Sequence, residues 1–153
     1  MEKGIKVIAL NKKASYDYFL FDTYEAGLVL EGSEIKSIRD GRVNLKDSYV
    51  QVKNKEAFII NMHIANYDKA GVFAPVTTRT RKLLLNKVEI NKIDGKINEK
   101  GYTLVPTKIY LKNGLAKLEI ALAKGKKNYD KRENEKNKDI NRNINKVLKE
   151  INS

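Results

Sequence analysis

The residues that most often perform covalent or metal chemistry are scarce in this sequence. The chain has one histidine, His63, in the apolar run IINMHIA, and it has no cysteine. One histidine without thiolates cannot build a zinc site of the His/Cys type, and its apolar context favours a half-buried structural role. Carboxylate pairs such as Glu31 and Glu34 are explained by acidic groups at the start of a helix. These observations argue against catalysis.

Motifs that bind nucleotide cofactors are also missing. The sequence contains neither a Gly-x-x-x-x-Gly-Lys-Ser/Thr loop nor a Gly-x-Gly-x-x-Gly turn after a strand. We therefore predict a protein that is not an enzyme, with no catalytic residues, no metal and no cofactor.

Basic residues carry the functional signal instead. Lys and Arg number 31 against 19 Asp and Glu, which gives a formal net charge of +12. A field of this size favours polyanionic partners such as nucleic acid. A solvated surface explains scattered lysines, but it explains less well the paired arginines, which suit bidentate phosphate contacts. The clusters are Lys12-Lys13, Lys36 with Arg39 and Arg42, Arg79-Arg81-Lys82, and Lys124 to Arg132.

Tyrosines lie beside several of these charges. Looped or single-stranded RNA is bound by base stacking on aromatic rings next to phosphate contacts. Tyr16 and Tyr18 fit this role, although both fit a core position equally well. Tyr129, between Asn128 and Asp130, has no evident core to join and is the best stacking candidate.

Length and composition predict one domain without a membrane span. The chain has 153 residues, of which 41% are hydrophobic and 33% are charged. No apolar run approaches the roughly 18 residues that a membrane-spanning helix needs, and the N-terminus does not resemble a signal peptide. We expect a cytoplasmic monomer. A membrane-surface adaptor remains the least favoured alternative, because the basic tail lacks Trp and Phe and also carries acidic residues.

The hydrophobic pattern predicts a mostly β body. Strands are expected over 5–10 and 24–30, and hairpins over 48–65 and 102–123, the second across Asn113-Gly114, the strongest hairpin signal present. Pro106 then requires an edge or a bulge. Helical spacing is expected around Tyr16, over 34–39 after Ser33, and from Thr80 onward. These elements favour an antiparallel, oligonucleotide-binding-like β-barrel with about three flanking helices.

The last 30 residues differ from the body. Apolar residues recur there at helical spacing, at Ile140, Ile144, Val147, Leu148 and Ile151. Interspersed asparagines are poor helix formers, and an isolated helix of this length is marginal in water. We predict an RNA-binding domain over 1–123 and a basic tail over 124–153, disordered when free and helical on its partner.

The sequence resembles one known family over nearly its whole length. The matching segments, in order, are ALNKKASYDYFL, EAGLVLEGSEIKSIRDGRVNLKDSYV, EAF, RTRKLLLNKVEI and GYTLVPTKIYLKNGLAKLEIALAKGKKNYDKRE. They resemble the small protein B family, the bacterial partners of transfer-messenger RNA, which is also called SsrA RNA.

The resemblance implies a function in trans-translation. Members of the family bind the tRNA-like domain of transfer-messenger RNA, enter stalled 70S ribosomes, and place their tail in the decoding centre and empty mRNA channel. The nascent peptide is then tagged for degradation, and elongation factor Tu takes part only through the charged RNA. The alternative is a general RNA- or single-stranded-DNA-binding barrel with a non-specific basic tail.

The resemblance also implies site residues. Asn11, Glu25 and Leu84 match positions implicated in RNA contact, although Leu84 fits the core of a helix about as well. Ser15-Tyr16 departs from the Arg-His common in the family. The complete predicted RNA-binding set is Asn11, Lys12, Lys13, Tyr16, Glu25, Lys36, Arg39, Arg79, Arg81, Lys82 and Leu84. The predicted ribosome-contacting set in the tail is Lys124, Gly125, Lys126, Lys127, Tyr129, Asp130, Lys131 and Arg132.

Overall fold

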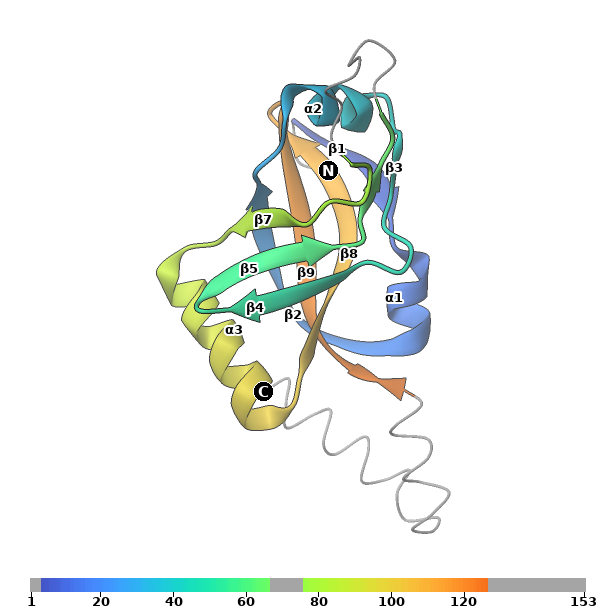
Figure 1. Cartoon of the computed structure of the whole chain (residues 1–153). Coiled ribbons are helices and arrows are strands. Elements are labelled where there is room, and N and C mark those ends of the chain that lie inside the picture. Colours follow the sequence, from blue (N-terminus) through green and yellow to red (C-terminus); the bar gives the residue numbers. More distant parts are fainter. Residues whose placement is uncertain (1–3, 67–75, 127–153) are drawn as a thin grey trace.

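The computed structural model describes residues 4–66 and 76–126 (Figure 1). Its helices are α1 (Lys12–Asp17), α2 (Gly32–Arg39) and α3 (Lys87–Lys100). Its strands are β1 (Ile5–Leu10), β2 (Tyr18–Leu28), β3 (Val43–Asn44), β4 (Tyr49–Lys53), β5 (Glu56–Ile60), β6 (His63–Ile64), β7 (Arg81–Leu84), β8 (Thr103–Lys112) and β9 (Leu115–Gly125).

Six strands form a closed ring of antiparallel pairs. The order β8-β4-β5-β7-β2-β9 returns to β8 because β8 and β9 pair directly. The ring closes at one narrow point, where Val50 of β4 faces Leu104 of β8. Strand β1 adds to the free part of the β8 edge, and β3 pairs separately with β6. The predicted mostly β, antiparallel fold with three helices is confirmed.

Two tight turns set the register of the hairpins. Asn54 and Lys55 between β4 and β5 have φ of 52° and 61°, and Asn113 and Gly114 between β8 and β9 have φ of 52° and 83°. Positive φ at both central residues is the turn geometry that matches the twist of paired strands. Both predicted hairpins are therefore confirmed, and the register shift after Pro106 is the predicted bulge.

The segment after Thr80 differs from the prediction. We expected a helix there, but residues 81–84 form β7, and the helix begins only at Lys87. Pairing with β5 and β2 overrides the helical propensity of the Leu-rich run. Asn86 then caps α3 by accepting a hydrogen bond from the Glu89 backbone N–H.

The end of α1 and the N-terminal cap of α2 also differ from the prediction. Helix α1 ends at Asp17, so the residues expected to continue it as a helix, Phe19 and Leu20, lie in β2. Helix α2 is capped by Glu31 and Glu34 in a reciprocal capping box rather than by Ser33. It ends at Arg39, followed by Asp40 and Gly41 as expected, and Gly41 has φ of 75°.

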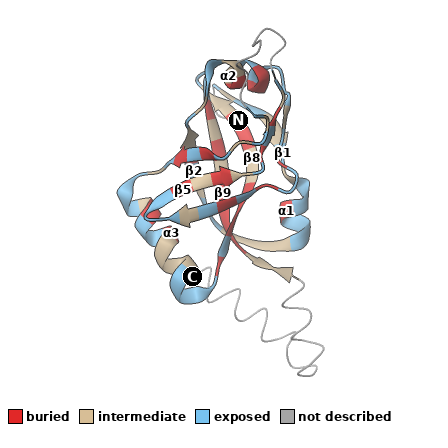
Figure 2. Ribbon diagram, in the orientation of Figure 1, coloured by how far each residue is buried: buried red, intermediate tan, exposed pale blue. Residues whose placement is uncertain are grey.

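The core fills the inside of the ring, and buried residues alternate with less buried ones along β4, β5 and β7 (Figure 2). Ile59, Leu104, Ile109, Leu118 and Ile120 are among its fully buried members. A second, smaller cluster lies outside the ring, where Ala14 of α1 packs on Val105 and Ala123. This contact fixes α1 against the barrel wall.

The barrel extends slightly beyond the predicted domain boundary. Strand β9 runs to Gly125, two residues past Ala123, and pairs there with Tyr18 and Phe19 of β2. The predictions for the tail from Lys127 onward, its disorder and its partner-induced helix included, fall outside the described residues.

Candidate nucleic-acid interface

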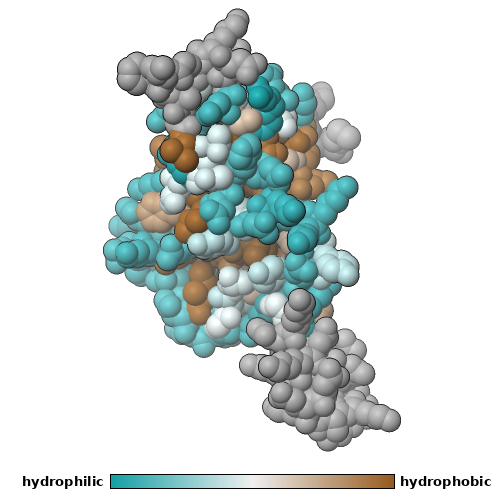
Figure 3. All heavy atoms as spheres, turned by 45° about the vertical axis from the view of Figure 1, so that its right-hand side comes forward, coloured by the Kyte–Doolittle hydropathy of each residue, from teal (hydrophilic) through white to brown (hydrophobic). Residues whose placement is uncertain are grey.

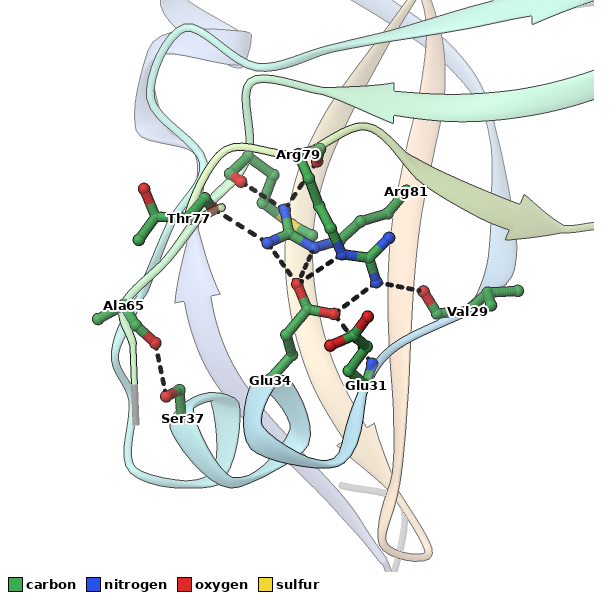
Figure 4. A network of polar contacts seen from close by, with 9 residues as sticks. Val29, Glu31, Glu34, Ser37, Ala65, Thr77, Arg79 and Arg81 are labelled. Atoms are coloured by element: carbon green, nitrogen blue, oxygen red, sulfur yellow. Dashed lines mark hydrogen bonds and ion pairs between the residues drawn. The ribbon is translucent and has the colours of Figure 1, made fainter. Parts of the chain in front are cut away.

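A buried ion-pair network lies between α2 and β7 (Figure 4). Arg79 and Arg81 both donate to the carboxylate of Glu34, from Arg79 Nη2 to Oε1 at 2.5 Å and from Arg81 Nε to Oε2 at 2.7 Å. The Glu31 backbone N–H also donates to Oε1, at 2.9 Å. Together these donors satisfy both oxygens of a carboxylate that is almost fully buried.

The structure corrects the predicted role of Arg81. Its side chain is 0% exposed, because β7 alternates and places Arg81 and Leu83 inward. Its other donors bind the backbone oxygens of Met62 at 2.7 Å and Thr77 at 3.0 Å. Arg81 thus has no surface to offer to RNA and instead ties α2 to β7. Arg79 retains a partly exposed side chain.

Opposing effects set the ionisation of this network. Burial alone would raise the pKa of Glu34, but hydrogen bonds from Arg79, the Glu31 N–H and Arg81, with the charge of Arg81, outweigh it and lower this pKa. The hydrogen bond to Glu34 raises the pKa of Arg79, whereas burial lowers the pKa of Arg81. Arginine ionises so far above neutrality that Arg81 remains charged, and all three groups are ions at pH 7.

One row of residues crosses the outer wall of the barrel. In the strand register Val7 faces Tyr110, Tyr110 faces Lys117, Lys117 faces Gly27, and Gly27 faces Leu84. Residues that face each other across antiparallel strands share one side of a sheet. We call these five residues the outer row.

Leu84 lies at the end of the outer row and is 53% exposed. The prediction left open whether it belongs to a helical core, and the structure places it in a strand, facing solvent. Gly27 makes room for it, because a Cβ built on Gly27 would lie 3.3 Å from the Leu84 Cβ. This is the close approach expected of a glycine inside a strand. Next to Leu84 on β7, the exposed Lys82 pairs with Glu56 at 3.4 Å.

Glu25 lies on β2 beside the outer row and is 39% exposed. The Tyr110 hydroxyl donates to its Oε1 at 2.5 Å, and Lys112 Nζ is 3.5 Å from the same atom. The Tyr110 hydrogen bond has the largest effect and lowers the pKa of Glu25. Burial opposes this shift, and the Lys112 charge adds to the lowering. The site therefore presents an oriented carboxylate as an acceptor, with the Lys112 cation beside it.

Sequence reasoning missed Tyr110, Lys112 and Lys117 as parts of this site. The Asn-Gly turn contained the signal, because it fixes the β8–β9 register that puts Tyr110 opposite Lys117. The position of Glu25 depends on the distant β2–β9 pairing, in which it faces Glu119. That pairing has no local signature.

Helix α1 carries the next group of predicted residues. Tyr16 is 80% exposed, which leaves its ring on the surface rather than in the core. Lys12 and Lys13 are exposed, whereas Tyr18 packs against the second cluster. The Asn11 side chain donates to the Pro106 backbone oxygen at 2.8 Å. Asn11 thus also anchors α1 to β8.

The remaining predicted residues lie at the two ends of the molecule. Lys36 and Arg39 are exposed on α2 at the top of Figure 1. At the end of β9, Lys124 Nζ lies 4.8 Å from the Tyr102 ring centre, and Lys126 Nζ donates to the Ser15 backbone oxygen at 2.9 Å. Gly125 pairs with Tyr18. The predicted tail residues Lys127, Tyr129, Asp130, Lys131 and Arg132 fall outside the described residues.

Across residues 4–66 and 76–126, no group of three His, Cys, Asp or Glu residues is arranged to hold a metal ion. His63 is exposed on β6 opposite Asn44, rather than half-buried as we expected. In the same ranges, no helix is long and apolar enough to cross a membrane.

The fold and this surface define a basic β-barrel protein whose exposed wall suits a polyanion. The family model described as SmpB protein matches residues 8–150, and the chain belongs to this family.

Relatives from several bacteria resemble the chain over nearly its whole length. An SsrA-binding protein of Thermoanaerobacter pseudethanolicus is 57% identical over 97% of this chain and 96% of its own length. An SsrA-binding protein of Bacillus subtilis is 54% identical over 98% of this chain and 97% of its own. A solved chain from the work "tmRNA-SmpB: a journey to the center of the bacterial ribosome" is 42% identical, with a TM-score of 0.65 over 77% of this chain and 83% of that one.

Proposed function

We propose that this chain binds SsrA RNA, the transfer-messenger RNA, and acts in trans-translation. The observation that carries the proposal is the match, at 54–59% identity and over nearly the full length, to proteins named SsrA-binding protein. The chain would hold the tRNA-like domain of this RNA as a monomer. It would contribute binding and positioning and no chemistry of its own.

The outer wall of the barrel supplies groups suited to RNA. Glu25 accepts hydrogen bonds from 2′-hydroxyls or base amino groups, and the exposed Leu84 packs against a base. Lys108, Lys112 and Lys117 on β8 and β9 lie near Glu25 and neutralise phosphates. Rigid barrel strands hold these groups in place before the RNA arrives, which lowers the entropic cost of binding.

The other predicted contacts extend this surface. On α1, Asn11, Lys12 and Lys13 lie beside the exposed ring of Tyr16, which can stack on a base. Lys36, Arg39, Arg79 and Lys82 offer further cations toward SsrA RNA or ribosomal RNA. Arg81 is not kept in this set, because it is buried against Glu34.

We further propose that the tail contacts the stalled 70S ribosome. Lys124, Gly125 and Lys126 leave the barrel as the last described residues of β9 and its continuation. From there Lys127 to Arg132, with Tyr129 among them, would enter the decoding centre and the empty mRNA channel. Elongation factor Tu would meet this protein only through the charged RNA.

Peptide tagging on stalled ribosomes tests this division of labour. The full chain and a chain ending after Lys126, which keeps the contacts of β9, are added to a reconstituted system with SsrA RNA. We expect the shortened chain to bind SsrA RNA nearly as well as the full chain but to support no tagging. Tagging by the shortened chain would contradict the proposed role of the tail.

A general RNA- or DNA-binding barrel is the second candidate, supported by the charge of +12 alone. Binding that rests on phosphate contacts weakens by orders of magnitude between about 50 and 200 mM salt. Specific binding to SsrA RNA should retain a larger share of its affinity over this range and resist excess random RNA.

A further inference from the structure

A shallow hollow lies beside β8, between its pairing with β4 and its pairing with β1. Strand β8 pairs with β4 at Leu104 and with β1 from Lys108 onward. Between these points no strand pairs with this edge of β8 in the described residues, and Asn11 donates to the backbone oxygens of Pro106 and Thr107. Helix α1 and the loop between β3 and β4 border the opening. The resulting hollow has a volume of about 380 Å³. Sites for small molecules occupy roughly 300–1,000 Å³.

The floor of the hollow is apolar, and two tyrosines contribute to its walls. Ala14 and Val105 are buried members of the cluster beneath α1 and form the floor. The rings of Tyr18 and Tyr49 line the hollow, and Tyr49 is 47% exposed. Figure 3 shows hydrophilic and hydrophobic residues side by side on the face it brings forward, instead of one continuous apolar patch. Planar bases stack well on such rings.

Among the charged groups that line the hollow, carboxylates outnumber cations. Asp17 and Asp47 contribute two carboxylates. Asn11 uses one amide N–H on Pro106, and its amide oxygen can accept from a ligand. Lys13 is the single cation among the residues that line the hollow. Two carboxylates disfavour a phosphate here, and acceptors favour a ligand whose edge donates.

We propose that this hollow binds one unstacked guanine base of the partner RNA. Guanine presents an N1–H and an N2 amino group along one edge, which a carboxylate can accept as a pair. Tyr49 would stack on the base, while Lys13 at the rim would contact the phosphate of the same nucleotide. A basic protein side chain suits the carboxylates too, but the +12 charge of the chain repels it. The proposal rests on the proposed function only in taking RNA as the ligand.

The test uses short RNA probes and the full chain. We would titrate the pentanucleotides UUGUU, UUIUU and UUUUU and follow the backbone amide signals of Asn11 and Tyr49 by NMR. We expect UUGUU to shift both signals and to bind about tenfold or more tightly than UUUUU. The inosine probe lacks the N2 amino group and should fall between them.

Replacing one carboxylate tests the acceptor directly. Asp47→Asn should reduce the preference for UUGUU over UUUUU by about fivefold to a hundredfold, the range of a paired base contact. Asp47 has φ of 61°, which asparagine also tolerates, so the loop should keep its shape. Asp40→Asn at the end of α2 makes the same change away from the hollow and should leave the preference unchanged.

The outcomes separate this proposal from the proposed function. Guanine-dependent shifts at the hollow would support it even if the chain failed to bind SsrA RNA, a result that would overturn only the function. Equal responses to all three probes, or no response at the hollow from a chain that binds SsrA RNA, would overturn the proposal. Saturation of the hollow by an arginine-rich peptide in preference to UUGUU would also overturn it.

Discussion

Two neighbouring cations on β7, Arg81 and Lys82, have different roles. Arg81 points inward and is held by Glu34, whereas Lys82 points outward and makes only a surface pair with Glu56. The two side chains point in opposite directions because successive residues of a strand face opposite sides of the sheet. The same basic cluster therefore supplies both an internal support and an exposed charge.

Removing Arg81 should be costly to folding. Arg81→Ala leaves the buried Glu34 carboxylate without its most buried partner, and we expect a loss of about 3–5 kcal/mol in the free energy of unfolding. Lys82→Ala, the control on the same strand, should cost less than about 1 kcal/mol. Urea unfolding of both variants checks this. Similar small losses for the two would show that the network contributes little.

The pKa of Glu34 predicts how the network depends on pH. Because folding lowers this pKa, its stabilisation is complete above the ordinary glutamate value near 4.3 and disappears as pH falls below it. The difference in unfolding free energy between the natural chain and Glu34→Gln should be constant from about pH 7 to 5 and shrink below about pH 4. Unfolding midpoints across this range would reveal it. A difference that grows on acidification would contradict the assignment.

Glu25 should matter for binding rather than for folding. Glu25→Ala removes an exposed acceptor whose contacts are Tyr110 and Lys112, and we expect SsrA RNA binding to weaken by about 1–3 kcal/mol if the RNA contact is desolvated. Glu99→Ala, an exposed carboxylate at the end of α3, serves as the control and should leave affinity unchanged. Calorimetric titration measures both. Equal affinities would remove Glu25 from the site.

Among the elements, the contact between β2 and β7 links the fold to the site. Gly27→Val adds a side chain where a Cβ alone lies 3.3 Å from Leu84, so Leu84 must move. We expect several-fold weaker RNA binding, while the strand tolerates a β-branched residue well. Gly32→Val places the same group where nothing lies within 4 Å and should not change binding. A filter-binding comparison in which both variants bind normally would contradict the role of Leu84.

Local sequence patterns predicted the hairpins, whose turn residues favour positive φ. The hairpin across Asn113 and Gly114 was predictable because few residues accept positive φ, and the turn alone sets its register. The strand at 81–84 was not predictable, because its run of leucines also suits a helix. Only its pairing with β5 and β2 decides between a helix and a strand.

The residues of the site were predictable only in part. The resemblance and the residue types selected Glu25 and Leu84, and the structure places both on the outer wall of the barrel, on neighbouring strands. The residue types also selected Arg81, which is buried. Its partner Glu34 lies 47 residues away in the sequence, and no spacing rule connects them. Charge patterns show that a cation is present but not which way it points.

For the whole molecule, excess charge and defined contacts play separate roles. The charge of +12 draws any nucleic acid to the surface and speeds association, and salt screens this attraction. The oriented carboxylate of Glu25 and the exposed Leu84 depend on the exact shape of the RNA. Selectivity for SsrA RNA should therefore increase as salt removes the non-specific part of binding.

Competition binding separates specific recognition of SsrA RNA from attraction by charge. The full chain is titrated into labelled tRNA-like domain of SsrA RNA at about 200 mM salt with a large excess of random RNA. We predict that binding persists under these conditions and weakens when Glu25 is replaced by alanine. Loss of binding to the same extent as for an unrelated RNA of equal length would contradict the account.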